Sequence, residues 1–186
     1  MSLRYGFKTR ANRISLRLRR SLGLTPEAPI DLDVIVHRLE ISIVPLSDFR
    51  EEYAASERQL SKIDPGAFSA ATLRCGPTKR IIVHNDSHDR GRQRSNIAHE
   101  LSHVLLGHPF TLPIDPSGCR NMDRDMEDEA AWLGGTILIS NEAAIYIVRT
   151  AMDTETACRI YGVSTPMLRM RINASGARRR VQRSVH

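Results

Sequence analysis

The chain has 186 residues, of which 41% are hydrophobic and 26% charged; this suits one soluble globular unit and is too short for two full domains. No apolar run approaches the roughly 18 residues that span a bilayer, and the Arg-containing N-terminus does not resemble a signal peptide, so we expect a cytoplasmic protein without membrane contact. Cys75, Cys119 and Cys158 lie far apart without a C-x-x-C spacing, which argues against a disulfide framework or a cysteine zinc site.

The net charge of +6 is concentrated at the two ends of the chain. One cluster consists of Arg13, Arg17, Arg19 and Arg20, and a second lies within residues 178–183. Basic ends can attract nucleic acid or an acidic protein, so weak electrostatic contact with DNA is one expectation. The other interpretation is a solvated helix face followed, at the far end, by an untidy terminus.

The first third of the chain predicts two helices and a strand. Apolar residues recur every three to four positions over residues 7–22, which indicates an amphipathic helix. A short helix capped by Asp31 is expected over residues 31–39, followed by a strand over residues 41–45. Residues 48–65 mix acidic and basic side chains and are interpreted as a loop or an irregular helix.

The middle of the chain predicts a hairpin followed by a long helix. Residues 67–74 and 80–85 are strand-like, and the Gly76-Pro77 turn signal separates them. These two segments should therefore pair as an antiparallel hairpin. Strong helical periodicity then follows over residues 92–107.

The last part of the chain is expected to be helical. Pro109, Pro113 and Pro116 mark a loop before it. Three helices are predicted after this loop, over residues 124–139, 142–152 and 155–171. The single predicted domain thus covers residues 1–176, and the basic residues 177–186 are expected to form a disordered tail.

One segment combines metal-binding residue types with helical spacing. His99, Glu100 and His103 form an H-E-x-x-H pattern inside the helix predicted over residues 92–107. A helix turns by about 100° per residue, so His103 lies about 40° from His99 and Glu100 about 100° from it. Two imidazole nitrogens can then reach one zinc ion, while apolar residues on the opposite face anchor the helix. The competing interpretation is two helical histidines that are paired with carboxylates or simply solvated.

A catalytic zinc ion needs a third protein ligand and an open position for water. Two glutamates of the helix predicted over residues 124–139 are candidates. Steps of three, four and seven from Glu127 reach small residues such as Gly134, whereas the same steps from Glu129 reach larger side chains. Because small residues let two helices approach closely, Glu127 is the better third ligand and Glu129 the second choice. Alternatively, the acidic cluster only favours the dipole of its helix.

Glu100 adjoins a candidate ligand without being one itself. With zinc polarising a peptide carbonyl and lowering the pKa of its bound water, Glu100 is placed to take the proton and pass it to the leaving amine. The pattern therefore predicts metal-assisted hydrolysis. His108 lies about 140° around the helix from His103 and near its end, which makes it a poor candidate ligand.

Three segments together resemble one known family. Residues 6–24 resemble the opening of the ImmA/IrrE metallopeptidases, residues 94–106 their A-H-E-L-x-H core, and residues 127–140 their E-x-E-A segment. The resemblance covers nearly the whole chain. It implies an α+β fold, a compact zincin-like metallopeptidase domain with a small antiparallel sheet, an H-E-x-x-H helix and a helical C-terminal segment.

The resemblance also implies roles for individual residues. His99, His103 and Glu127 would be the ligands of one zinc ion, and Glu100 would be the general base. Ala131 stands where the family usually has Asn or Asp. If the missing side chain orients a ligand histidine, its loss can lower metal affinity or activity about 10-fold or more. Weak or conditional activity is one expectation.

Members of this family are known for cleaving helix-turn-helix repressors encoded beside them, in toxin-antitoxin-like pairs, mobile elements and stress responses. The resemblance thus implies such a repressor as the protein substrate. Within the helical region 142–172, residues 157–169 themselves resemble a helix-turn-helix, with Gly162 at the turn and Ser164 near the second cap. This unit would bind DNA or serve for packing and partner docking. The alternative function is a DNA-binding or protein-interacting regulator with a weakly active peptidase fold; the intact H-E-x-x-H pattern favours the peptidase.

Overall fold

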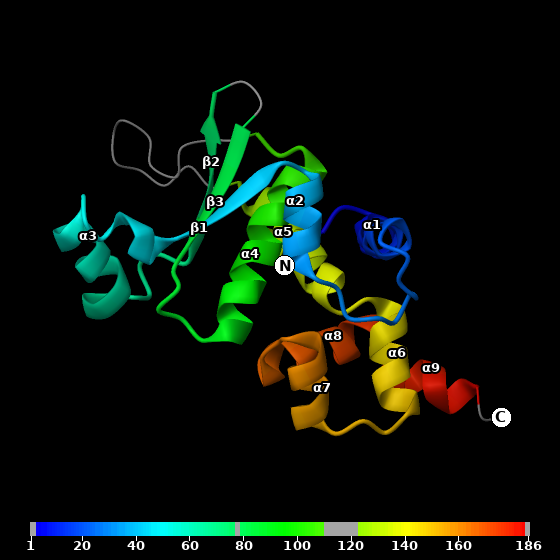
Figure 1. Ribbon diagram of the computed structural model, residues 1–186. Coiled ribbons are helices and arrows are strands. Elements are labelled where there is room, and N and C mark those ends of the chain that lie inside the picture. Colours follow the sequence, from blue (N-terminus) through cyan, green and yellow to red (C-terminus); the bar gives the residue numbers. More distant parts are fainter. Residues whose placement is uncertain (1–2, 77–78, 110–122, 185–186) are drawn as a thin grey trace.

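Helices make up most of the chain, and α4 (Arg90–Leu106) and α2 (Leu32–Arg38) pack against one small sheet (Figure 1). The computed structural model describes residues 3–76, 79–109 and 123–184, so Pro113, Pro116 and Cys119 lie outside the described residues. The helices are α1 (Phe7–Ser21), α2 (Leu32–Arg38), α3 (Ala54–Arg58), α4 (Arg90–Leu106), α5 (Arg124–Leu138), α6 (Asn141–Arg149), α7 (Thr154–Tyr161), α8 (Thr165–Ser175) and α9 (Ala177–Arg183), with the 3-10 helix η1 (Leu46–Phe49) and the π-helix η2 (Gln59–Ile63). The strands are β1 (Ile41–Pro45), β2 (Ala70–Cys75) and β3 (Lys79–His84). The α+β class predicted from the sequence is confirmed.

The sheet has the strand order β1-β3-β2. β3 carries a β-branched run, which favours extended chain, and its Ile82 is fully buried at the centre of the sheet. β2 and β3 pair antiparallel, with Thr72 opposite Ile82, which confirms the predicted hairpin. β1 instead runs parallel to β3, with Ile43 opposite Ile82, so the sheet is mixed rather than antiparallel as expected. The long connection that holds η1, α3 and η2 allows this pairing, because parallel strands need a crossover of a dozen or more residues.

Helix α4 contacts both the sheet and α5 (Figure 1). It begins after Asp89, whose carboxylate accepts a hydrogen bond from the backbone N–H of Arg92. It ends at Gly107, which has φ of 70°, a left-handed conformation that glycine adopts without strain. α5 approaches closely, since a Cβ atom on Gly134 would lie 3.0 Å from the carbonyl oxygen of Ala98. The small-residue stripe predicted on α5 is therefore the contact face between the two helices.

One hydrophobic core joins the helices to the sheet. On α4, Ala98 and Leu101 are fully buried, and they lie on the anchoring side of the helix. Leu133 and Ile137 of α5 are also fully buried. The core thus fixes α4 and α5 relative to each other, and the remaining faces of the two helices are left for the candidate site.

Two arginines are buried at the C-terminal end of α5. Arg19 of α1 donates hydrogen bonds to the carbonyl oxygens of Ile137 and Leu138, and Arg171 of α8 donates to that of Ile139. Burial lowers the pKa of each guanidinium group to about 10, so both stay charged at neutral pH. Positive charge is favourable there because the last carbonyls of a helix have no partners within it. Arg19 therefore belongs to the core and not to a solvated face, as one interpretation of the N-terminal Arg cluster assumed.

The C-terminal third is helical, but its helices differ from those expected. The single helix expected over residues 155–171 is divided into α7 and α8 at Gly162, which has φ of 61°. The division agrees with the helix-turn-helix resemblance, which placed the turn at Gly162 and the second cap near Ser164. Ser164 then caps α8 by accepting a hydrogen bond from the N–H of Met167. The residues assigned to a disordered tail form α9 up to Arg183; its first residue, Ala177, is fully buried, and the helix contacts α6.

Among the described residues, no single helix combines the length and hydropathy needed to cross a membrane. Only α5 and α6 taken together pass that test, and a bend of 47° separates them.

Candidate metal centre

Helices α4 and α5 bring the three predicted ligands together. The ring nitrogens of His99 and His103 and a carboxylate oxygen of Glu127 all lie within 4.8 Å of one another. Nε2 of His99 is 3.1 Å from Nε2 of His103 and 3.1 Å from Oε2 of Glu127. Nε2 of His103 is 3.5 Å from Oε1 of Glu127. The three side chains are 28%, 17% and 32% exposed, so a small ion or a peptide can reach the group from solvent.

These separations suit a tetrahedral metal ion. Zinc binds imidazole nitrogen and carboxylate oxygen at about 2.0–2.2 Å, so neighbouring ligand atoms in a tetrahedral site lie about 3.3–3.5 Å apart. Two imidazoles and one carboxylate are also a donor set of catalytic zinc sites, which keep the fourth position open. Without a metal ion, hydrogen bonds from the two histidines would explain their contacts with Glu127. The 3.1 Å separation of the two Nε2 atoms would then need a proton between them, whereas a shared metal ion explains all three separations together.

The charges of the group agree with a cation site. Hydrogen bonds from His103 and His99 hold the pKa of Glu127 well below its usual range. Burial by itself lowers the pKa of His99, but the hydrogen bond to Glu127 and the charges of Glu100 and Glu127 outweigh it and raise that pKa above its ordinary value. Glu127 is therefore an anion throughout the physiological range, as a metal ligand must be.

Glu100 lies outside the ligand group and faces the sheet. Its Oε2 accepts a hydrogen bond of 2.8 Å from the hydroxyl of Thr72, which belongs to the edge strand β2. Thr72 was not identified from the sequence. The sequence predicted a strand over residues 67–74, but only the packing of α4 on the sheet shows that Thr72 meets Glu100.

A comparison with protein families decides what kind of domain holds this group. The chain matches the IrrE N-terminal-like domain of the peptidase M78 family over residues 45–173. The chain belongs to this family. The match covers more than half of the sequence and includes α4 and α5, and it confirms the predicted resemblance to the ImmA/IrrE metallopeptidases. A search of curated proteins gave no match.

Behind the ligands of this M78 domain lies a second group of polar side chains. Nδ1 of His108 is 3.0 Å from Nδ1 of His103, and Nε2 of His108 is 3.6 Å from Oε2 of Glu129. Arg4 donates two hydrogen bonds of 2.6 Å to Glu129. From the sequence, His108 was expected about 140° around the helix from His103. This angle does not apply, because α4 ends at Gly107 and the chain turns there.

Neither Glu129 nor His108 belongs to the ligand group. The carboxylate of Glu129 is directed to Arg4 and His108, which supports Glu127 as the third ligand. The hydrogen bond from Arg4 lowers the pKa of Glu129, so this carboxylate is ionised. Burial and the neighbouring charge of His103 lower the pKa of His108.

Within the described ranges, the ring of His99 is held by contacts at one nitrogen, whereas the ring of His103 is held at both. Among the described residues, the side chain of His99 makes hydrogen-bond contacts only through Nε2, with Glu127 and His103. Ala131, one turn after Glu127, offers no polar group. Nδ1 of His99 thus has no hydrogen-bond partner in the described part of the chain.

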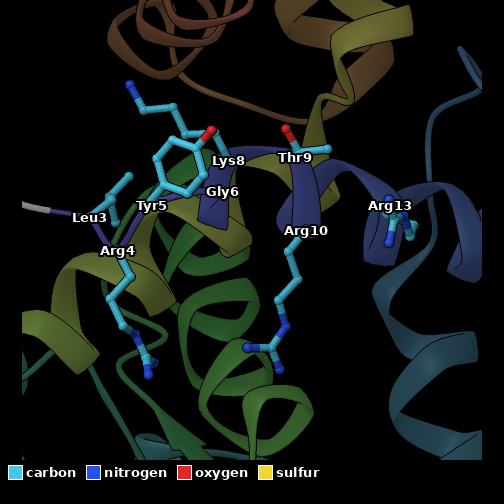
Figure 2. A pocket seen from close by; sticks show the side chains of 8 residues that line it. All are labelled: Leu3, Arg4, Tyr5, Gly6, Lys8, Thr9, Arg10 and Arg13. Carbon is cyan, nitrogen blue, oxygen red and sulfur yellow. The ribbon is translucent and has the colours of Figure 1, made fainter.

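The N-terminal segment forms a pocket of its own, shown in Figure 2. The pocket has a volume of about 580 Å³ and is lined by Leu3, Arg4, Tyr5, Gly6, Lys8, Thr9, Arg10 and Arg13. None of the three candidate ligands lines it. Arg4 points away from the side occupied by Tyr5 and Lys8, and this direction takes its guanidinium group to Glu129 (Figure 2).

Proposed function

We propose that this protein is a zinc-dependent metallo-endopeptidase that cleaves a helix-turn-helix repressor. The observation that carries the proposal is the arrangement of His99, His103 and Glu127 around one position, with Glu100 beside them, in a peptidase family. Zinc, when bound by these three side chains, supplies a Lewis acid that activates water and polarises a peptide carbonyl.

The protein's own side chains move the protons. Glu100 takes the proton of the attacking water and delivers it to the leaving amine. Thr72 holds Oε2 of Glu100, while Oε1 has no hydrogen-bond partner among the described residues. This leaves one carboxylate oxygen for the reaction and restrains the position of the other.

The edge strand β2 is where an extended substrate would bind. Among the described residues, β2 pairs only with β3, and in this part of the chain its outer edge offers backbone groups to another strand. Thr72 links this strand to Glu100, which places the edge beside the reacting groups. A repressor would therefore be cleaved in an exposed loop or linker, since a folded helix has no free backbone groups for such pairing.

The test is a comparison of glutamate variants. Purified wild-type protein should contain zinc in stoichiometric amount by elemental analysis. Glu100→Gln should keep the zinc but stop cleavage of a co-expressed repressor encoded by the neighbouring gene, as judged by mass spectrometry, because the base is gone while all ligands remain. Glu127→Gln should weaken zinc binding and lose cleavage together, and Glu155→Gln, an exposed change on α7, should alter neither. Wild type without a transition metal, or normal cleavage by Glu100→Gln, would contradict the proposal.

A DNA-binding regulator is the second candidate, and the pair α7 and α8 favours it. Gly162 and Ser164 form the turn between them, and Arg169 and Asn173 are exposed on the outer face of α8. The inner face of α8 carries the buried Arg171, which donates a hydrogen bond at the end of α5. α8 therefore already serves as a structural element, and only a narrow outer face is free for DNA.

A further inference from the structure

We propose that Arg4, Glu129 and His108 form a chain of contacts that fixes the tautomer and orientation of the ligand His103. This inference rests on the proposed function, because it requires a metal ion at Nε2 of His103. Metal-binding histidines commonly donate their second ring N–H to another group, which orients the ring. Here the second group is itself a histidine, and a buried carboxylate stands behind it.

The positions of the protons follow from the chemistry of imidazole. When Nε2 of His103 binds a metal, the neutral ring carries its proton on Nδ1. This N–H faces Nδ1 of His108 at 3.0 Å, so His103 donates and His108 accepts. Neutral His108 then carries its proton on Nε2. The reverse assignment would place the proton of His103 on Nε2 and would block the metal.

Glu129 links His108 to Arg4. Its carboxylate is 1% exposed and is held by two hydrogen bonds of 2.6 Å from Arg4. Nε2 of His108 has no hydrogen-bond partner among the described residues and faces Oε2 of Glu129 at 3.6 Å. The separation is longer than a hydrogen bond, so the link is electrostatic and favours the N–H on the side of the carboxylate. The protons of both imidazole rings thus point away from the metal position and toward the carboxylate of Glu129.

Through this chain of contacts, the N-terminal segment takes part in the proposed metal centre. Arg4 lies outside the residues 45–173 that match the family, yet it holds the carboxylate at the end of the chain. The other ligand histidine, His99, has no comparable support in the described residues, and Ala131 offers none. We therefore expect the metal affinity of this protein to depend strongly on His108 and Glu129, the groups behind His103.

Two substitutions of His108 separate this role from simple packing. Asn places its amide near the position of Nδ1 and can still accept the N–H of His103, whereas Gln places its amide near Nε2 and cannot. Zinc affinity is measured on metal-free protein by competition with a chelator, and the geometry of the site by the visible absorption of bound cobalt(II). His108→Gln should lower zinc affinity about 10-fold or more and change the cobalt spectrum, while His108→Asn should stay close to wild type.

A matched pair of glutamates tests the far end of the chain. Glu129→Gln removes a buried carboxylate that is paired with a 68% exposed arginine, and Glu57→Gln removes a 4% exposed one paired with a 60% exposed arginine away from the ligand group. Glu129→Gln should weaken zinc binding, by less than Glu127→Gln does, and Glu57→Gln should not.

Equal zinc affinity in wild type, His108→Asn and His108→Gln would overturn the inference. An equal loss in Glu129→Gln and Glu57→Gln would also overturn it, because both would then act through stability alone. Wild type that binds neither zinc nor cobalt would refute the proposed function itself, and this result is visible before any variant is compared.

Discussion

In the proposed site, a proton and a metal ion compete for one nitrogen of His99, the Nε2 that lies 3.1 Å from Glu127. The raised pKa of His99 means that, in metal-free protein, the pair with Glu127 stabilises the fold below the unfolded pKa of about 6.5 and loses this effect as the pH rises through the higher folded value. A proton must leave before zinc can bind.

Zinc affinity should therefore fall as the pH decreases below the raised pKa of His99 and level off above it. Chelator competition between about pH 5.5 and pH 8.5 measures this dependence, and its midpoint should lie above the ordinary histidine pKa of about 6.5 because the pKa of His99 is raised. Glu127→Gln removes the partner that raises the pKa, so the weaker binding left in that variant should lose its pH dependence at a lower pH. A zinc affinity that is constant across the range would contradict this account.

The sequence predicted the residues whose positions depend on one helix alone. His99, Glu100 and His103 are brought onto one face of α4 by the helical repeat, so their spacing was sufficient. Thr72 and the chain behind His103 depend on contacts between segments far apart in sequence, which no local pattern contains. His108 was placed wrongly because the helical repeat was continued beyond Gly107, where the backbone leaves the helix.

At the scale of elements, the end of α5 depends on buried positive charge. Arg19 reaches two of its last carbonyl oxygens, while the next residue of α1, Arg20, is exposed. Arg19→Gln should lower the free energy of unfolding by about 3 kcal/mol, since buried carbonyls lose their donor, whereas Arg20→Gln should change it by less than about 0.5 kcal/mol. Urea denaturation of the two variants measures the difference. Equal stabilities would show that α5 does not need this cap.

Local signals predicted helix caps and the pairing of strands adjacent in sequence, whereas they did not predict contacts between distant segments. Asp31 caps α2 as predicted, and the expected hairpin is present. The parallel partner of β3 could not be predicted, because the pairing of β1 is decided by the long connection that precedes β2. The helix α9 was also missed, since its Arg-rich composition suggests a solvated tail and only the burial of Ala177 reveals its packing.

At the scale of the whole molecule, positive charge remains at both ends of the chain. Arg178, Arg179 and Arg180 are exposed on α9. We expect weak, nonspecific DNA binding whose logarithm falls linearly with the logarithm of salt concentration, because phosphate contacts release counterions. Changing these three arginines to Gln should lower the salt slope by up to about 0.9 per lost contact, as measured by fluorescence anisotropy. A sequence-specific footprint at physiological salt would instead support the regulator function.

The close approach of α4 and α5 has an evolutionary consequence. Gly134 carries no functional group and takes no part in the reaction, but a Cβ atom there would lie 3.1 Å from the backbone nitrogen of His99. Even alanine would push the two helices apart and move Glu127, two turns away on the same face, relative to the histidines. If the proposed metal centre is functional, we expect natural selection to act on position 134 as well as on the candidate ligands. Over long divergence we expect this glycine to change only together with compensating changes on α4.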